Sequence, residues 1–287
     1  MQAATPVRTL KTRSPLAEFA KKALIYLVLI AVGVVMAFPF YYMVSLSLSS
    51  MEEIFNFPPP LIPKELLFSN YLRVWEAAPF ERYMFNSLLV ACSVAAAHMF
   101  FDSLAGFVFA KYRFPGRDAM FMAIVSTLIL PFFVRMIPLY LIAAKLGWVN
   151  TYQGLIFPFV MSGYGIFLMR QFIKPIPNEL LEAARSDGCG EFGTYWRIVL
   201  PQCKPVLATD GLFTFIYQWN NFLWPLIITT TVEMKTLPLG LVLFKQEQWV
   251  QWNYMAGGAL ILFLPALLMF LLAQRYFVQG IVLSGMK

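Results

Sequence analysis

Charged residues are scarce in this sequence. Asp, Glu, Lys and Arg make up 13% of the 287 residues, while apolar residues reach 60%. A typical soluble domain has about 25% charged residues. So few charges can hardly cover a water-facing surface, and so many apolar residues are incompatible with a disordered chain. The composition therefore excludes both classes, and most of the surface must face lipid.

Cysteine and histidine are also rare. The three cysteines form no Cys-x-x-Cys pair and there is a single histidine, so the spacing of a zinc site or a disulfide framework is missing. The sequence also lacks a Gly-x-x-x-x-Gly-Lys-Ser/Thr phosphate loop and any nucleophile–base arrangement. We therefore expect no enzyme: no catalytic residue, cofactor or metal. The net charge of +7 is explained by membrane topology without a nucleic-acid partner.

Six apolar segments reach the roughly 20 residues that a helix needs to cross a bilayer. They are residues 23–44, 83–110, 119–143, 154–173, 205–229 and 255–277. The first is longer than the apolar region of a signal peptide, so it is predicted to stay as a membrane anchor after a polar tail, residues 1–22. The predicted fold class is all-α, a polytopic membrane protein with six transmembrane helices.

Lys and Arg are distributed unequally between the two sides of these segments. They are more than twice as frequent on the side that carries both termini as on the opposite side. Positive residues accumulate in cytoplasmic loops. The sequence therefore predicts that both termini lie in the cytoplasm.

Three ionisable residues fall within the predicted spans, where charge is costly and often functional. His98 and Asp102 share one helix face, either as a proton or ion path or as a local pair that binds a neighbouring helix. Arg135 lies between Pro131 and Pro138, where it either lines a cavity or extends to the membrane interface.

The segment 175–205 predicts two short helices around a glycine turn on the cytoplasmic side. Asn178 is expected to cap the first helix, Gly188 to allow the turn, and Pro201 to end the second helix. Leu180, Leu181 and Ala184 give the first helix a small apolar face. Such a face docks on a soluble protein or lies on lipid; the acidic first helix favours the protein.

This segment resembles a known motif. It reads Glu182-Ala183-Ala184, three residues, Gly188, nine residues, and Ile198-Val199-Leu200-Pro201. That pattern resembles the EAA loop of maltose-type (carbohydrate uptake) ABC importer permeases, the inner membrane components of binding-protein-dependent transport systems. Further similar stretches are Asn86-Ser87, 137–140, Ile176-Pro177, Asp187-Gly188, Trp219-Asn220 and 274–280.

The resemblance implies a type I importer fold with a core over residues 83–278, in a multi-pass protein of the bacterial cell membrane. A second homologous permease would form the other half of the pore. Two ATPase subunits and an extracytoplasmic solute-binding protein would complete the complex. The residues expected to dock on an ATPase subunit are Glu182, Ala183, Ala184, Gly188, Ile198, Leu200 and Pro201.

Aromatic rings and amides in the fourth and fifth spans suit a sugar or polyol, which presents hydroxyl groups and C–H faces. The expected translocation-path residues are Tyr164, Gln218, Asn220 and Trp224. The alternative function is a self-sufficient, ion-coupled secondary transporter that uses His98, Asp102 and Arg135. The 175–205 segment separates the two hypotheses, because a self-sufficient transporter needs no docking helix.

Overall fold

The computed structural model describes residues 15–58, 61–245 and 250–284, so most of the predicted tail lies outside the described residues. Every named element within them is a helix. The α-helices are α1 (Pro15–Leu48), α2 (Met51–Ile54), α3 (Ser69–Glu76), α4 (Phe80–Lys111), α5 (Arg117–Ser126), α6 (Phe132–Lys145), α7 (Tyr152–Ile156), α8 (Gly163–Ile173), α9 (Asn178–Ser186), α10 (Glu191–Thr194), α11 (Leu200–Gln202), α12 (Lys204–Trp219), α13 (Leu223–Ile228), α14 (Leu237–Gly240) and α15 (Trp252–Ser284). Short 3₁₀ helices are η1 (Thr127–Ile129), η2 (Phe157–Phe159), η4 (Val232–Met234) and η5 (Leu241–Phe244), and η3 (Tyr195–Val199) is a π-helix.

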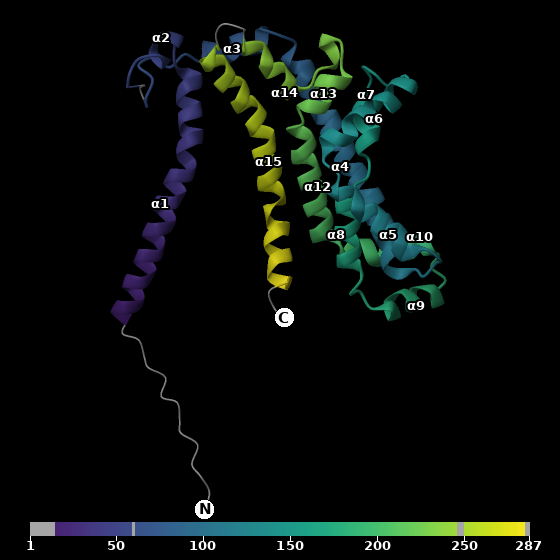
Figure 1. Ribbon diagram of the computed structural model, residues 1–287. Helices are drawn as coiled ribbons and strands as arrows, with labels where there is room; N and C mark the ends of the chain where they lie inside the picture. Colours follow the sequence, from purple (N-terminus) through teal and green to yellow (C-terminus); the bar gives the residue numbers. More distant parts are fainter. Residues whose placement is uncertain (1–14, 59–60, 246–249, 285–287) are drawn as a thin grey trace, which may run out of the picture.

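Three continuous helices in the described part of the chain are long and apolar enough to cross a membrane. They lie within α1, α4 and α15 and contain the predicted spans 23–44, 83–110 and, for the most part, 255–277. Figure 1 shows that α1 begins and α15 ends on the side of the molecule where α9 lies. We call this side the hairpin end, and the opposite side, with α2, α3, α13 and α14, the far end.

The predicted span 119–143 is not one continuous helix. The chain breaks after η1, and the two helical parts meet at an angle of 107°. Leu130 is extended, with ψ 114°, and Pro131 follows it. Proline lacks an N–H and disfavours helical geometry in the residue before it, so the break falls where the sequence places that proline.

Two other predicted spans are also interrupted. Within 154–173 the helices bend by 41° before Gly163, where the Ser162 hydroxyl accepts a hydrogen bond from the Gly165 N–H at 2.9 Å. The span 205–229 is divided between α12, of 16 residues, and α13. If each bent pair is one span, the described residues contain up to five that meet the length and apolarity criteria.

Helix α4 is the central element, with α8 and α12 packed beside it (Figure 1). A Cβ on Gly106 would lie 2.6 Å from the Cβ of Met169, so the glycine lets α4 and α8 approach closely. At the far end, the Asn86 amide donates to the carbonyls of Glu233 and Lys235, both at 2.8 Å. The same helix therefore fixes loops at the far end and, as described below, at the hairpin end.

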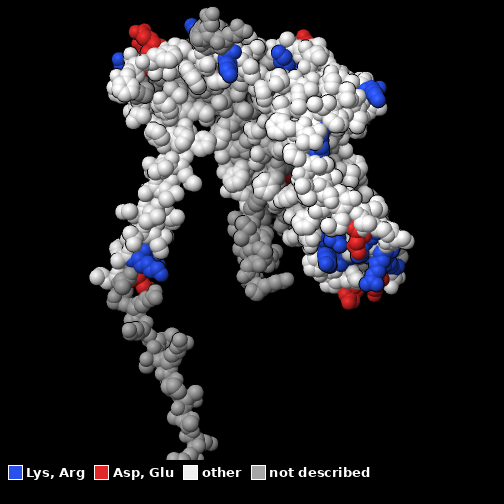
Figure 2. All heavy atoms as spheres, in the orientation of Figure 1, with Lys and Arg blue, Asp and Glu red and all other residues white. Residues whose placement is uncertain are grey.

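Helix α1 stands apart from the bundle along most of its length (Figure 1). None of the residues in its most apolar window is buried. It meets α15 near the far end, where the rings of Phe40 and Phe263 are 4.8 Å apart. Figure 2 shows the charged side chains gathered mainly at the two ends, with a nearly uncharged middle, as expected for a surface that faces lipid.

Candidate functional site

Residues 178–202 form two helical pieces around a glycine turn, as the sequence indicates; we call them the hairpin. Gly188 has φ +78°, a conformation that glycine adopts without steric cost. The N–H of Gly188 donates to the carbonyl of Arg185 at 3.0 Å, and that of Cys189 to the carbonyl of Ala184 at 2.9 Å. These bonds satisfy the last carbonyls of α9 and end the helix. The expected Asn178 cap is not formed: Pro177 is the N-cap residue, and the Asn178 side chain binds elsewhere.

Two residues of the apolar face of α9, Leu181 and Ala184, are turned inward, whereas the third, Leu180, is 44% exposed. Leu181 and Ala184 are 3% and 7% exposed. Leu181 packs in a core cluster with Phe107 and Tyr195. The exposed members of the motif in this half are Glu182, Ala183 and Gly188. Ala184 therefore holds α9 on the bundle, and a different set of residues faces the surroundings.

The second half of the hairpin combines a buried anchor with an exposed aromatic pair. Tyr195 is fully buried, and its hydroxyl is 2.7 Å from that of Ser103. Phe192 and Trp196 are more than half exposed and stack at 6.2 Å. Ile198 and Leu200 are partly buried, while Pro201 is exposed. Pro201 lies inside α11 and does not end the helical path as predicted; the interruption comes at Cys203.

Two side chains at the end of α4 hold the hairpin in place. The Lys111 ammonium group donates to the carbonyls of Lys174 and Ile176 and to the side-chain oxygen of Asn178. The Tyr112 hydroxyl and, at 3.0 Å, the Arg185 guanidinium group donate to the Glu191 carboxylate. Both contacts hold the pKa of Glu191 below its ordinary value. The hairpin is thus bound to α4.

Replacing Lys111 with Met should loosen the hairpin without unfolding the bundle. Three acceptors lose a charged donor, and a hydrogen bond to a charged group contributes about 1.5–3 kcal/mol. Hydrogen exchange of residues 174–190 should therefore become roughly tenfold faster or more. Lys204→Met is the matched control, because the Lys204 side chain is exposed and forms no hydrogen bond or ion pair within the described chain. Equal exchange in both variants would contradict the role of Lys111.

A cavity of about 500 Å³ lies between α4, α6, α8 and α12. Tyr164 and Gln218, two of the expected path residues, line it, and so does Arg135, whose side chain is also exposed at the surface. Trp224 is instead buried, with its indole N–H donating to the Gly154 carbonyl at 2.9 Å. Asn220 is exposed, and its amide donates to the carbonyl of Ile216. Neither of the last two is among the residues that line the cavity.

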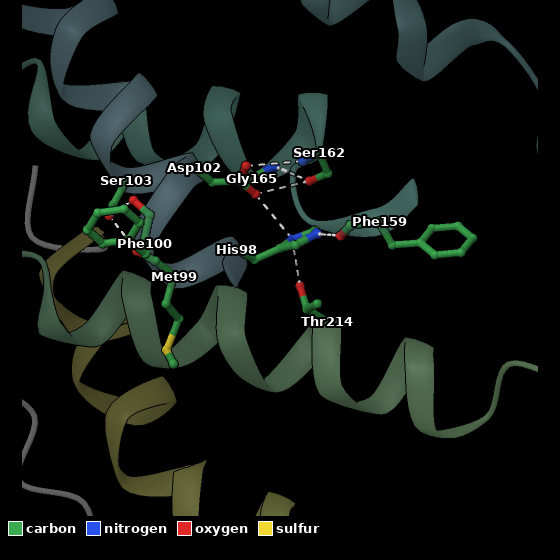
Figure 3. A network of polar contacts seen from close by, with 9 residues as sticks. All are labelled: His98, Met99, Phe100, Asp102, Ser103, Phe159, Ser162, Gly165 and Thr214. Atoms are coloured by element: carbon green, nitrogen blue, oxygen red, sulfur yellow. Dashed lines mark hydrogen bonds and ion pairs between the residues drawn. The ribbon is translucent and has the colours of Figure 1, made fainter. Parts of the chain in front are cut away.

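His98 and Asp102 form a pair that also binds neighbouring helices (Figure 3). Their side chains are 3.1 Å apart, and Asp102 accepts hydrogen bonds from the backbone N–H and hydroxyl of Ser162. The structure adds Asp210 from α12. One imidazole nitrogen of His98 and one carboxylate oxygen of each aspartate lie within 4.8 Å of one another. Asp210 and His98 are 112 positions apart in the sequence. Only the packing of α12 on α4 brings them together, so the sequence alone does not predict their contact.

Residues 103–282, which contain the hairpin and most of the cavity, match the family model described as "Binding-protein-dependent transport system inner membrane component". The chain belongs to this family. The permease resembles the arabinooligosaccharides transport system permease protein AraQ of Bacillus subtilis, with 34% identity over 78% of this chain and 80% of the relative. It also resembles the sn-glycerol-3-phosphate transport system permease protein UgpE of Rhizobium meliloti, with 36% identity over 90% and 94%.

The fold of the permease is also found among solved structures. A chain of a bacterial ABC transporter involved in the import of the acidic polysaccharide alginate superposes with a TM-score of 0.80. The match covers 93% of the permease and 100% of that chain, at 22% identity. The permease therefore has an ABC importer permease fold and is a multi-pass membrane protein.

Proposed function

We propose that the permease is one subunit of an ATP-driven importer for a sugar or a related polyol, and that it forms half of the translocation pathway with a second homologous permease. Family membership and the names of relatives such as AraQ and UgpE support this function. They favour it over the ion-coupled transporter. ATP hydrolysis belongs to two separate ATPase subunits, because the sequence lacks a phosphate-binding loop.

The observation that carries this proposal is the exposed part of the hairpin. Glu182 and Ala183 are exposed on α9, and Gly188 is exposed in the turn that follows it. Lys111 of α4 binds the first residue of this helix, Asn178. Phe192 and Trp196 add exposed aromatic surface, and such residues often anchor interfaces. In our proposal this surface inserts into an ATPase subunit in the cytoplasm. Movement of the ATPase subunits then reaches α4 through the hairpin.

The far end faces the extracytoplasmic space in this proposal, with both termini in the cytoplasm. The distribution of Lys and Arg in the sequence supports that orientation. Short helices and turns at the far end, among them α2, α3 and α14, offer a surface for a solute-binding protein (Figure 1). A bacterial alginate ABC transporter of similar fold was solved in complex with an alginate pentasaccharide-bound periplasmic protein.

Reconstitution of the complete complex in proteoliposomes tests the function. The permease, its partner permease, two ATPase subunits and the solute-binding protein would be assayed with arabino-oligosaccharides and sn-glycerol 3-phosphate. We expect uptake that requires ATP and the solute-binding protein. Uptake by the permease alone, driven by a proton or sodium gradient, would overturn the proposal in favour of the ion-coupled transporter.

Gln218 tests whether the cavity carries solute. Its amide lines the cavity and is 8% exposed, so Gln218→Leu keeps the volume and removes the hydrogen-bonding group. Loss of one good hydrogen bond to a solute hydroxyl costs about 1.4 kcal/mol, so uptake should fall roughly tenfold. Gln153→Leu is the matched control, because Gln153 is exposed and does not line the cavity. Unchanged uptake in the Gln218 variant would place the solute path elsewhere.

A further inference from the structure

The cluster of His98, Asp102 and Asp210 concentrates negative charge in the interior of the permease. The three residues are 7%, 0% and 1% exposed. Arg135 lines the same cavity but forms no ion pair with either aspartate. Two carboxylates beside a neutral imidazole carry two uncompensated charges, which a buried, water-poor site disfavours strongly. Something positive must neutralise them.

The hydrogen bonds of His98 show which imidazole nitrogen carries a hydrogen and which one faces the carboxylates. Its Nε2 is 2.7 Å from the carbonyl oxygen of Phe159, which can only accept, so Nε2 carries a hydrogen. Its Nδ1 then faces the carboxylate of Asp102 at 3.1 Å and the hydroxyl of Thr214 at 3.0 Å (Figure 3). A histidine that ligates a metal commonly donates its other N–H to a backbone carbonyl in this way.

Asp210 supplies an independent indication. Its Oδ2 atom is buried and has no hydrogen-bond partner among the described residues. A proton on Nδ1 of His98 would give Asp102 a partner but would leave this oxygen without one. A cation between the three side chains would bind both carboxylates and the imidazole nitrogen.

We propose that His98 Nδ1, Asp102 and Asp210 bind a divalent transition-metal ion, such as Zn²⁺ or Mn²⁺. One imidazole nitrogen with two carboxylates suits these ions and disfavours Ca²⁺, which prefers oxygen ligands. The 3.1 Å between Nδ1 and the Asp102 oxygen is a distance that two ligands of one such ion can have. The charge of a divalent ion also balances the two aspartate carboxylates while His98 stays neutral.

The backbone of α8 lies directly against both carboxylates, and the cavity reaches the cluster from the other side. A Cβ on Gly165 would lie 2.0 Å from Asp102 Oδ2 and 3.0 Å from Asp210 Oδ1, so only glycine lets α8 lie against both carboxylates. Ser162 positions Asp102 through two hydrogen bonds, as supporting residues do at metal sites. His98 and Asp210 both line the cavity, which gives the ion access.

Metal analysis of the intact permease complex tests the site. The complex would be purified without chelator after Zn²⁺ or Mn²⁺ supplementation and analysed by mass spectrometry for bound metal. We expect about one ion per permease chain in the wild type and in Glu52→Gln, an exposed control at the far end, and none in Asp210→Asn. Equal metal content in Asp210→Asn and wild type, or no bound metal in wild type, would overturn the proposal.

A second measurement uses only the wild-type permease, so it remains valid if Asp210→Asn does not fold. Because the chain has a single histidine, ¹⁵N-histidine labelling gives one imidazole in the nuclear magnetic resonance spectrum of the permease. Zn²⁺ should shift the Nδ1 signal and leave Nε2 protonated. An Nδ1 that carries a proton and does not respond to Zn²⁺ or Mn²⁺ would show that protons neutralise the cluster instead. Neither experiment depends on which solute the importer carries.

Discussion

Glu182→Lys is expected to separate the permease from its ATPase subunits while leaving the permease folded. Glu182 is exposed on α9, and its side chain makes no hydrogen bond or ion pair with the described part of the chain. Charge reversal therefore removes nothing that the fold needs. In a desolvated interface an unmatched charge costs about 2–5 kcal/mol, which corresponds to a loss of affinity of roughly 30-fold or more.

Co-purification with tagged ATPase subunits and solute-stimulated ATP hydrolysis would measure this effect. Glu52→Lys is the matched control, because Glu52 is an exposed acidic residue of α2 at the far end. It should co-purify with the ATPase subunits like the wild type. If Glu182→Lys also retained full co-purification and coupled hydrolysis, the hairpin would not be the docking element, and the proposed route of coupling would fail.

Gly106→Ala should destabilise the permease itself. A Cβ at this position would lie 2.6 Å from the Cβ of Met169 and 2.9 Å from the backbone nitrogen of Arg170. Backbone cannot move aside as a flexible side chain can, so α4 and α8 must separate. Overpacking of this kind costs about 1–3 kcal/mol. We expect a lower midpoint of thermal unfolding in detergent and a lower yield of folded protein.

Gly33→Ala provides the contrast. Gly33 lies in α1, another membrane-spanning helix, and a Cβ there meets no atom within 4 Å. Alanine favours a helix over glycine by about 1 kcal/mol, so this variant should be as stable as the wild type or slightly more stable. Equal stability of Gly106→Ala and Gly33→Ala would mean that α4 and α8 leave enough space for a methyl group at position 106.

Local sequence patterns predicted much of this fold. Long apolar runs predicted α1, α4 and α15, because span length and apolarity are properties of a single segment. An interruption of the helix at Pro131 could be expected from the sequence, since proline removes a helical hydrogen bond. Its angle of 107° could not, because the angle depends on packing against other helices. Trp219, noted as part of a family motif, is fully buried, with its indole N–H bonded to the Leu262 carbonyl.

The candidate site was less predictable, because side-chain direction decides it. The pattern of α9 showed that one face is apolar, but not that Leu181 and Ala184 pack on the permease's own core. Tyr164 and Gln218 reach the cavity, whereas Trp224 is buried beside it. Asp210 joins His98 only through the contact of two helices that are distant in the sequence.

Because α4 is continuous, it can transmit a movement from one end of the permease to the other. Lys111 holds the hairpin at one end of this helix, and Asn86 holds the far-end loop through two carbonyls. The two residues are roughly 37 Å apart along a straight helix, so a tilt of about 5° about Lys111 displaces the Asn86 anchor by roughly 3 Å. No proline interrupts the helix between them. A small tilt of α4 at the hairpin end thus becomes a displacement of several ångströms at the far end.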